Sequence, residues 1–175
     1  MRIFSFPAII GSGARVLILG SMPGVVSLGA SQYYAHPRNQ FWSLMGELCG
    51  ATPDLPYPQR LQVLLDHHIA LWDVLHSCVR PGSLDASIEH HTAQPNDLLH
   101  LLRQADRIGR ICCNGGTAYL ALKRHFEGPL AQEFPRLEVL KLPSTSPANA
   151  SWTYARKRNA WRSALNIALD VATAT

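Results

Sequence analysis

The residues best suited to chemistry in this chain follow an early apolar segment. The apolar run Val16-Leu17-Ile18-Leu19 leads into Gly20-Ser21-Met22-Pro23-Gly24, and Tyr33-Tyr34-Ala35-His36-Pro37-Arg38-Asn39-Gln40-Phe41-Trp42 follows shortly after. The two glycines around Pro23 let a ligand approach the main chain closely. Tyr34 offers a ring for stacking, and the Asn39 amide can both donate and accept hydrogen bonds. These residue types favour a flat heterocycle such as a nucleobase.

Hydrophobic periodicity predicts the elements that must position these residues. Apolar runs predict four strands, at 16–19, 69–75, 108–113 and 137–142. Helical spacing predicts helices over 41–50, 60–67 and 98–102, from about 116 toward 126, and from about 151 to 172. This alternation predicts one domain over residues 1–175, a three-layer α/β/α fold around a central, mostly parallel four-stranded sheet.

Polar loops follow the predicted strands at what should be one edge of the sheet. They contain residues 20–24, Asp73, residues 114–116 and residues 143–149. Ligands of such sheets bind at the carboxyl ends of the strands, so the loops predict a shared site. Asp73 either faces the ligand there or caps a loop, and the sequence leaves both roles open.

Two motifs resemble those of the uracil DNA glycosylase superfamily, most nearly its hypoxanthine DNA (deoxyinosine) glycosylase branch. They are the segment from Gly20 to Trp42 and the second motif, Leu142-Pro143-Ser144-Thr145-Ser146-Pro147-Ala148-Asn149. Mismatch-specific uracil glycosylases carry a water-positioning Asn in the first motif, where this chain has Met22. In the hypoxanthine branch the catalytic amide is the Asn of the His-Pro-x-Asn segment, which is Asn39 here. The departure at Met22 therefore favours the hypoxanthine branch.

The resemblance implies a monofunctional DNA glycosylase that flips a deaminated purine out of DNA and hydrolyses its N-glycosidic bond without a cofactor. Asn39 would hold the attacking water. The implied base pocket comprises Gly20, Ser21, Met22, Pro23, Gly24, Tyr34 and Asp73. The implied DNA contacts are His36, Arg38, Asn114, Gly115, Ser144, Thr145, Ser146, Pro147, Asn149, Arg156 and Arg158.

Structural alternatives exist for each of these residues. Asn39 could bridge two loops, Tyr34 could be a core aromatic, and the serines of the second motif are ordinary turn residues. The basic residues after that motif, including Lys157, could form a solvated helix face instead of lying along DNA. At the level of function, a uracil or mismatch-specific glycosylase and a non-catalytic nucleic-acid-binding module remain alternatives.

Composition narrows the remaining possibilities. The chain has 175 residues, 47% of them hydrophobic, and a net charge of +4, which is compatible with a DNA partner but does not require one. No apolar run reaches the ~18 residues of a membrane helix, and the first residues are too soon broken by Pro7 for a secretory signal. We therefore expect a cytoplasmic protein without membrane association, and separately we expect a monomer.

The cysteines and histidines lack the spacing of a metal site. Cys49, Cys78, Cys112 and Cys113 contain no Cys-x-x-Cys pair, and neighbours in a strand point to opposite faces. The histidines at 67–68 and 90–91 are adjacent pairs. We predict reduced core thiols and no metal. Lys141 lies within a predicted strand, which disfavours it as a Schiff-base nucleophile.

Overall fold

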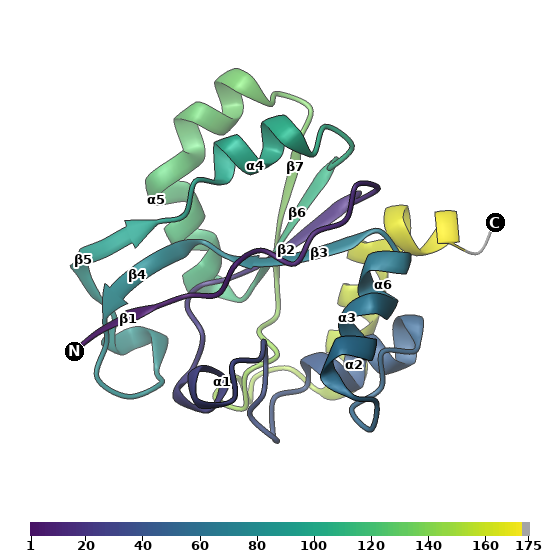
Figure 1. Cartoon of the computed structure of the whole chain (residues 1–175), viewed down its shortest axis with the longest axis horizontal. Coiled ribbons are helices and arrows are strands. Elements are labelled where there is room, and N and C mark those ends of the chain that lie inside the picture. The colour runs from purple at the N-terminus through teal and green to yellow at the C-terminus, as the bar shows by residue number, and fades with distance from the viewer. Residues whose placement is uncertain (173–175) are drawn as a thin grey trace.

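A four-stranded parallel sheet forms the centre of the computed structural model, which describes residues 1–172; residues 173–175, the end of the predicted domain, lie outside the described residues. The strand order is β3 (Ile69–Asp73), β2 (Val16–Gly20), β6 (Arg110–Asn114) and β7 (Glu138–Leu142) (Figure 1). Gly20 is in register with Asp73, and Asn114 with Leu142. The carboxyl ends of all four strands therefore meet at one edge of the sheet.

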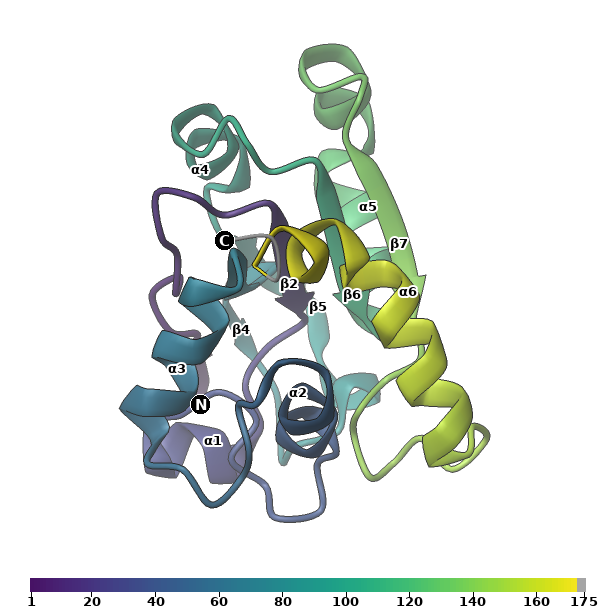
Figure 2. The same ribbon diagram turned by 90° about the vertical axis from the view of Figure 1, so that its right-hand side faces the viewer.

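Helices cover both faces of this sheet. Helices α4 (Leu98–Gln104) and α5 (Gly116–Glu133) pack on one face, and α2 (Phe41–Cys49), α3 (Tyr57–Asp66) and α6 (Tyr154–Ala172) pack on the other, the face turned toward the viewer in Figure 2. Successive residues of β2 alternate between the two cores, as the pleat requires. The predicted three-layer α/β/α architecture is confirmed.

The adjacent cysteines follow the same alternation. Cys112 packs in the core that contains Trp161, and Cys113 in the core that contains Leu122, so the prediction of opposite faces is confirmed. All four cysteines are free thiols, and burial raises the pKa of both Cys112 and Cys113 to about 12. Within residues 1–172, no group of three or more His, Cys, Asp or Glu side chains could hold a metal ion.

A second sheet was not predicted. Its strands β1 (Arg2–Phe4), β4 (Leu75–Val79) and β5 (Glu89–Pro95) pair antiparallel and lie to the left in Figure 1. The single strand expected over 69–75 is wrong, because the chain leaves the central sheet after Asp73, where the Val74 N–H donates to the Gly20 carbonyl at 2.8 Å. The β4–β5 connector, residues 80–88, returns through a 3₁₀ turn, η1 (Asp85–Ser87), beside the first motif.

The remaining differences concern one additional helix and the boundaries of several elements. A short helix, α1 (Val25–Ala30), follows the first motif and was not expected. Helix α5 continues past Phe126 to Glu133 with Pro129 inside it, and α6 begins at Tyr154, three residues later than predicted. No helix among the described residues has the length and apolarity needed to cross a membrane.

Candidate active site

A cavity of about 740 Å³ opens at the carboxyl edge of the central sheet. Its volume lies within the range of small-molecule sites. The predicted site residues that line it are Gly20, Ser21, Met22, Pro23, Gly24, Tyr34, His36, Arg38, Asn39, Asp73, Asn114, Ser144, Thr145, Ser146, Pro147 and Asn149. Of the predicted set, Gly115, Arg156 and Arg158 are outside this lining.

The floor of the cavity is formed where β2 and β3 end. A Cβ atom at Gly20 would lie 2.5 Å from Oδ1 of Asp73 and 3.3 Å from the Tyr34 hydroxyl. The first distance is too short for any side chain, so glycine at this position lets the Asp73 carboxyl and the Tyr34 hydroxyl approach the β2 backbone.

Two polar atoms at this floor are buried without a hydrogen-bond partner in the described chain. They are Oδ2 of Asp73 and the hydroxyl oxygen of Tyr34. Burial raises the pKa of Asp73 to about 7, with Asp85 adding to the rise and Arg80 opposing it. Burial, and then the nearby Asp73, also raise the pKa of Tyr34, whereas the nearby Asn114 side chain lowers it, although both ends of that amide already pair with Thr145. Unpaired buried polar atoms are costly in a folded protein, and a ligand that pairs with them removes that cost.

Tyr34 forms one wall of the cavity. Its ring stacks on Phe41 with centroids 4.0 Å apart and an interplanar angle of 25°, and Phe41 is fully buried. Tyr34 also has a φ of +56°, a left-handed conformation that is strained for a residue with a side chain. The core holds one face of the ring in place, and the residue itself borders the cavity, as a stacking platform for a base requires.

Asn39 is held at the start of α2. Its Oδ1 accepts a hydrogen bond from the Phe41 N–H at 2.9 Å, and its own N–H donates to the His36 carbonyl at 2.8 Å. This is a structural role, but it lies within one turn and is not the bridge between two loops that the alternative predicts. The half-buried side chain also lines the cavity, with its amide N–H₂ and a second lone pair on Oδ1 left over for a water molecule. The geometry is therefore compatible with both roles at once.

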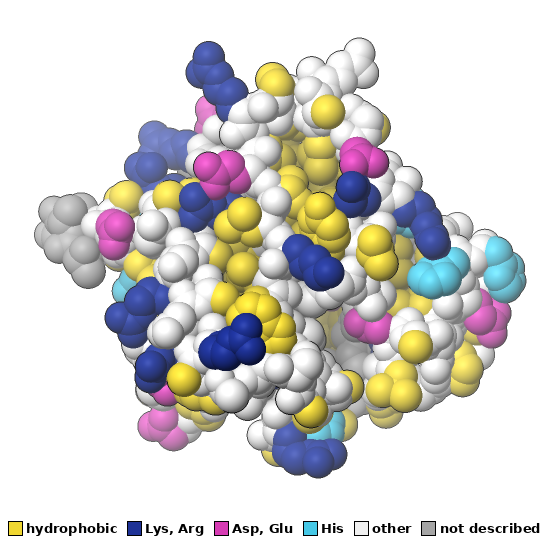
Figure 3. Space-filling model, turned by 180° about the vertical axis from the view of Figure 1, so that it is seen from behind, with side chains coloured by type: hydrophobic (Ala, Val, Ile, Leu, Met, Phe, Trp, Pro, Cys, Tyr) yellow, Lys and Arg dark blue, Asp and Glu magenta, His cyan; other side chains and the backbone are white. Residues whose placement is uncertain are grey.

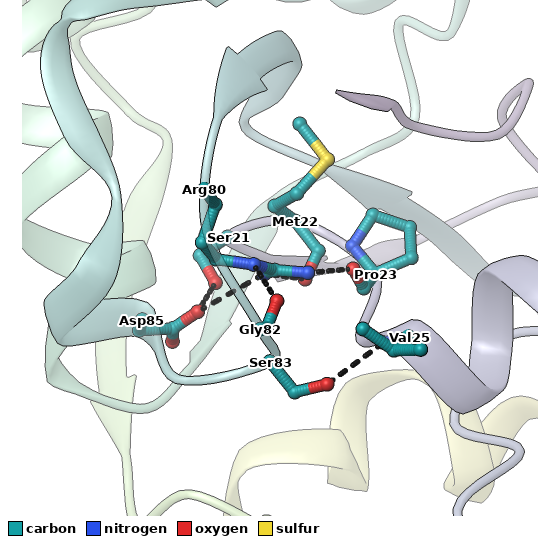
Figure 4. Close-up of polar contacts among 8 residues, drawn as sticks. All are labelled: Ser21, Met22, Pro23, Val25, Arg80, Gly82, Ser83 and Asp85. Carbon is teal, nitrogen blue, oxygen red and sulfur yellow. Dashed lines mark hydrogen bonds and ion pairs between the residues drawn. The ribbon is translucent and has the colours of Figure 1, made fainter. Parts of the chain in front are cut away.

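The β4–β5 connector clamps the first motif from outside (Figure 4). The side chain of Arg80 is fully buried and donates to the carbonyls of Gly82 at 3.1 Å, Met22 at 3.3 Å and Pro23 at 2.5 Å. Asp85 lies 3.8 Å from Arg80 and accepts a hydrogen bond from the Ser21 hydroxyl at 2.7 Å. Sequence reasoning missed this clamp, because a charged residue beside Pro81-Gly82 is typical of a surface loop.

This clamp fixes which backbone groups of the first motif can face a ligand. The carbonyl oxygen and the following N–H of a planar trans peptide point in opposite directions. Because Arg80 binds the Pro23 carbonyl, the N–H of Gly24 points away from Arg80. Ser83 Oγ accepts from the Val25 N–H at 2.9 Å, so this donor is occupied. Gly24 lines the cavity, with its N–H on the side of the peptide away from Arg80.

The second-motif loop, residues 143–149, rests on the end of β6. Thr145 is fully buried, its N–H donates to Oδ1 of Asn114, and its hydroxyl accepts from Nδ2 of Asn114, both at 2.9 Å. Gly115 has a φ of +97°, and a Cβ there would lie 2.9 Å from Cβ of Ser144. Thr145 is fully buried although it borders the cavity, and its contact with DNA stays a prediction. Asn114, Gly115 and Thr145 support the loop from below.

Ser144, Ser146 and Asn149 stabilise the turn above this support. The Ser144 hydroxyl accepts from the Ser146 N–H at 3.1 Å, and the Asn149 side chain donates to the Ser144 carbonyl at 3.1 Å. Pro147 is exposed at the tip of the loop. The contacts of these residues with DNA stay predictions.

The basic residues predicted to lie along DNA have different surroundings. Arg156 lies over the ring of Trp152, 4.4 Å from its centroid, and Arg158 pairs with Glu47 at 3.4 Å. Arg38 is exposed beside the cavity, whereas Lys157 is buried and cannot lie on a surface. On the face seen in Figure 3, the Lys and Arg side chains of the described chain are spread among acidic and apolar ones and form no single basic patch.

Comparison with known proteins places this geometry in a family. The family model of the uracil DNA glycosylase superfamily matches residues 7–169. The chain belongs to this superfamily. A solution NMR structure of a Methanosarcina acetivorans protein, provisionally assigned as a uracil DNA glycosylase, superimposes with a TM-score of 0.77 at 31% identity. That match covers 97% of this chain and 99% of the other.

Two relatives of this superfamily member are named hypoxanthine DNA glycosylase. The protein from Methanosarcina acetivorans is 35% identical over 153 residues, which is 87% of this chain and 91% of the relative. The protein from Methanosarcina barkeri is 41% identical over 90 residues, which is 51% of this chain and 57% of the relative. The predicted resemblance to the superfamily and to its hypoxanthine branch is confirmed.

Because the chain belongs to this superfamily, the identity of the first-motif residue Met22 bears on the mechanism. Its side chain is 6% exposed and packs in the core of the α4 and α5 face. At this position the first motif of this uracil DNA glycosylase superfamily member therefore carries a thioether, which is only a weak hydrogen-bond acceptor. The amide of Asn39, from the next turn along the chain, lines the same cavity.

Proposed function

We propose that this protein is a monofunctional DNA glycosylase that removes hypoxanthine from deoxyinosine in DNA. The names of its relatives and its family support this activity. The observation that carries the proposal is the cavity itself, which has an unpaired carboxyl oxygen and an unpaired hydroxyl at its floor and an amide in its wall. Because one chain supplies all of these groups, we propose that it acts as a monomer.

The floor matches the lactam edge of hypoxanthine, where a carbonyl stands beside an N–H. A protonated carboxyl group also has one donor and one acceptor, so Asp73 in its acid form can pair with both groups of the lactam. The raised pKa of Asp73, about 7, makes the acid form available near neutral pH. An ionised carboxylate would instead repel the base carbonyl. Tyr34 would stack on the flipped base above this floor.

Bond cleavage needs stabilisation of two charges and a placed water. Positive charge grows on the sugar and negative charge on the departing base, so donors fixed at the base stabilise the transition state. We expect the Gly24 N–H and the protonated Asp73 carboxyl group to be such donors. Asn39 would orient the attacking water, because a neutral amide positions water but is too weak a base to deprotonate it fully.

Uracil is the second candidate substrate, because it presents the same lactam edge to the cavity floor. The NMR structure with the same fold comes from a protein provisionally assigned as a uracil DNA glycosylase. The two proposals differ in the base released. A non-catalytic binding module would release neither base and would have no use for Asn39 in the cavity wall.

The test is incubation of the purified protein, in EDTA, with oligonucleotides that each carry one hypoxanthine, uracil, xanthine or ethenoadenine. We expect release of free hypoxanthine and an intact abasic site that breaks only after alkali. Excision confined to uracil would replace the proposal with its alternative. Lys141 does not line the cavity, so borohydride should trap no covalent adduct, and a trapped adduct would contradict the monofunctional mechanism.

A further inference from the structure

A buried lysine joins two of the loops that line the cavity. Lys157 of α6 is 2% exposed. Its Nζ donates to Oε1 of Gln40 at 2.9 Å and to the carbonyl of Asn149 at 3.1 Å. Gln40 directly follows Asn39, and Asn149 is the last residue of the second motif.

The same two loops are linked by a second contact. The N–H of Gln40 donates to the carbonyl of Thr145 at 2.9 Å, and Thr145 is fixed to Asn114 at the end of β6. The turn that carries Asn39 is therefore tied to the second-motif loop twice, once through its backbone and once through Lys157. Both ties act at the residue next to the amide.

Stability does not account for a lysine at this position. Among residues 1–172 no carboxylate lies within ion-pair distance of its Nζ, and burial lowers the pKa of Lys157. Its contacts are two neutral oxygens, which compensate an ammonium only in part. A methionine of similar length would fill the space without the desolvation penalty.

We infer that Lys157 is a positioning residue for the reaction: it holds the Asn39 turn against the second-motif loop and so fixes the water-holding amide relative to the bound nucleotide. This inference rests on the proposed glycosylase function. Lys157 is too buried to contact DNA itself, so its effect passes through Gln40 and Asn149. Displacement of a catalytic group by about 1 Å can lower a rate on the order of 10²-fold.

The primary variant is Lys157→Met, measured by single-turnover excision, DNA binding and thermal unfolding. We expect excision to fall roughly 10- to 100-fold, with DNA affinity close to that of the wild type. We also expect an unchanged or higher Tm, because a buried, partly compensated charge is removed. A loss of rate together with a gain in stability is a combination that a purely structural residue would not produce.

A double-mutant cycle with Gln40 identifies the contact through which the lysine acts. Gln40→Met removes the acceptor and leaves the ammonium less compensated, so its rate and its Tm should both fall. The double variant should recover the Tm of Lys157→Met. It should excise no more slowly than either single variant, because both changes break the same Lys157–Gln40 hydrogen bond. If Lys157→Met does not fold, Gln40→Met still tests that bond from its half-buried partner.

Lys123→Met is the matched control. Lys123 is exposed on α5 and pairs with Glu127, so the change removes the same charge far from the inferred contact. Its excision rate should equal that of the wild type. Wild-type excision by folded Lys157→Met would overturn the inference, as would a parallel loss of rate and Tm with additive effects in the cycle. An inactive wild type would instead remove the proposed function, because all of these rates are relative to it.

Discussion

The rim of the cavity, meaning the first-motif loop with its β4–β5 connector and the second-motif loop with its support on β6, differs from the floor in whether its buried polar atoms are paired. Around the rim, the Arg80 clamp satisfies the carbonyls of the first motif, and Asn114 pairs both ends of its amide with Thr145. At the floor, Asp73 and Tyr34 each keep a buried polar atom unpaired. Unpaired atoms are expensive in the free protein, so their concentration at one place indicates where a ligand supplies the missing partners.

The difference also separates two kinds of functional residue. Residues of the rim set positions, and their loss should lower stability or displace a neighbour. Residues of the floor and wall meet the base or the water, and their loss should change the reaction more than the fold.

The largest effect is expected for Asn39→Ala, on the reaction side of this division. Loss of the amide should reduce single-turnover excision on the order of 10²–10³-fold, as loss of one oriented group does in other sites. DNA binding should change little, because Asn39 is not among the groups expected to grip phosphates. A folded Asn39→Ala protein with near wild-type excision would sink the assignment and point to Asp73 as the group that handles water.

Asn39→Asp is the partner variant, and the structure makes its expected result more specific. Oδ1 of Asn39 already accepts from the Phe41 N–H, and aspartate preserves that acceptor. The start of α2 should therefore stay intact. Partial activity would mean that oxygen orients the water, whereas activity as poor as that of the Ala variant would mean that the amide N–H is required.

Arg80→Met should produce the largest loss of stability on the rim. Removing this fully buried cation leaves the carbonyls of Met22, Pro23 and Gly82 without the hydrogen bonds that it donates, and a buried acceptor left unsatisfied costs about 1–3 kcal/mol of unfolding free energy. Urea unfolding measures this loss. Arg103→Met is the control, because the Arg103–Glu133 pair is exposed and its removal should change stability little. Equal stability of the two variants would show that the clamp is not a structural support.

Asp73→Asn tests the floor through pH. The acid form of Asp73 predominates below its pKa of about 7 and is lost above it, so wild-type excision should fall about tenfold for each pH unit above that value. Asp85, Arg80 and the two tyrosines at 33 and 34 face this carboxyl but remain in the variant. Asparagine keeps one donor and one acceptor without titrating, so its profile should be flat over this range. A variant that kept the wild-type slope would assign the titration to another group.

The sequence predicted the central sheet and the converging loops because both follow from local patterns. The β2 run is apolar on both faces, and polar loops after parallel strands must meet at one edge. The second sheet has no such pattern. Strand β5 reads Glu-His-His-Thr-Ala-Gln-Pro, mostly exposed, and β1 pairs with a strand more than seventy residues away, at Val79. Pairing over that distance leaves no periodicity in the chain.

The two buried cations, Lys157 and Arg80, show a different limit on what the sequence can predict. In sequence, Lys157 stands between Arg156 and Arg158 and looks like part of a basic surface. Helical phase distinguishes it, because Lys157 lies four residues before Trp161 and seven before Ala164, on the stripe that is buried in α6. That signal could have found Lys157. For Arg80 we find no equivalent, since its burial depends on how the connector folds back over the first motif.

Tyr34→Phe should have the smallest effect and separates the two parts of the tyrosine. The ring is stacked on Phe41 and should supply most of the favourable binding free energy between Tyr34 and the base. Tyr34→Ala should therefore weaken substrate engagement by about 1–3 kcal/mol. Phenylalanine keeps that ring and removes a buried hydroxyl that has no partner in the free protein. We therefore expect an equal or slightly higher Tm and a loss of excision clearly smaller than that of Tyr34→Ala. Thermal unfolding and single-turnover excision of both variants measure this. A lower Tm for Tyr34→Phe would show that the hydroxyl is already satisfied, for example by a bound water, and would remove it from the atoms that await the base.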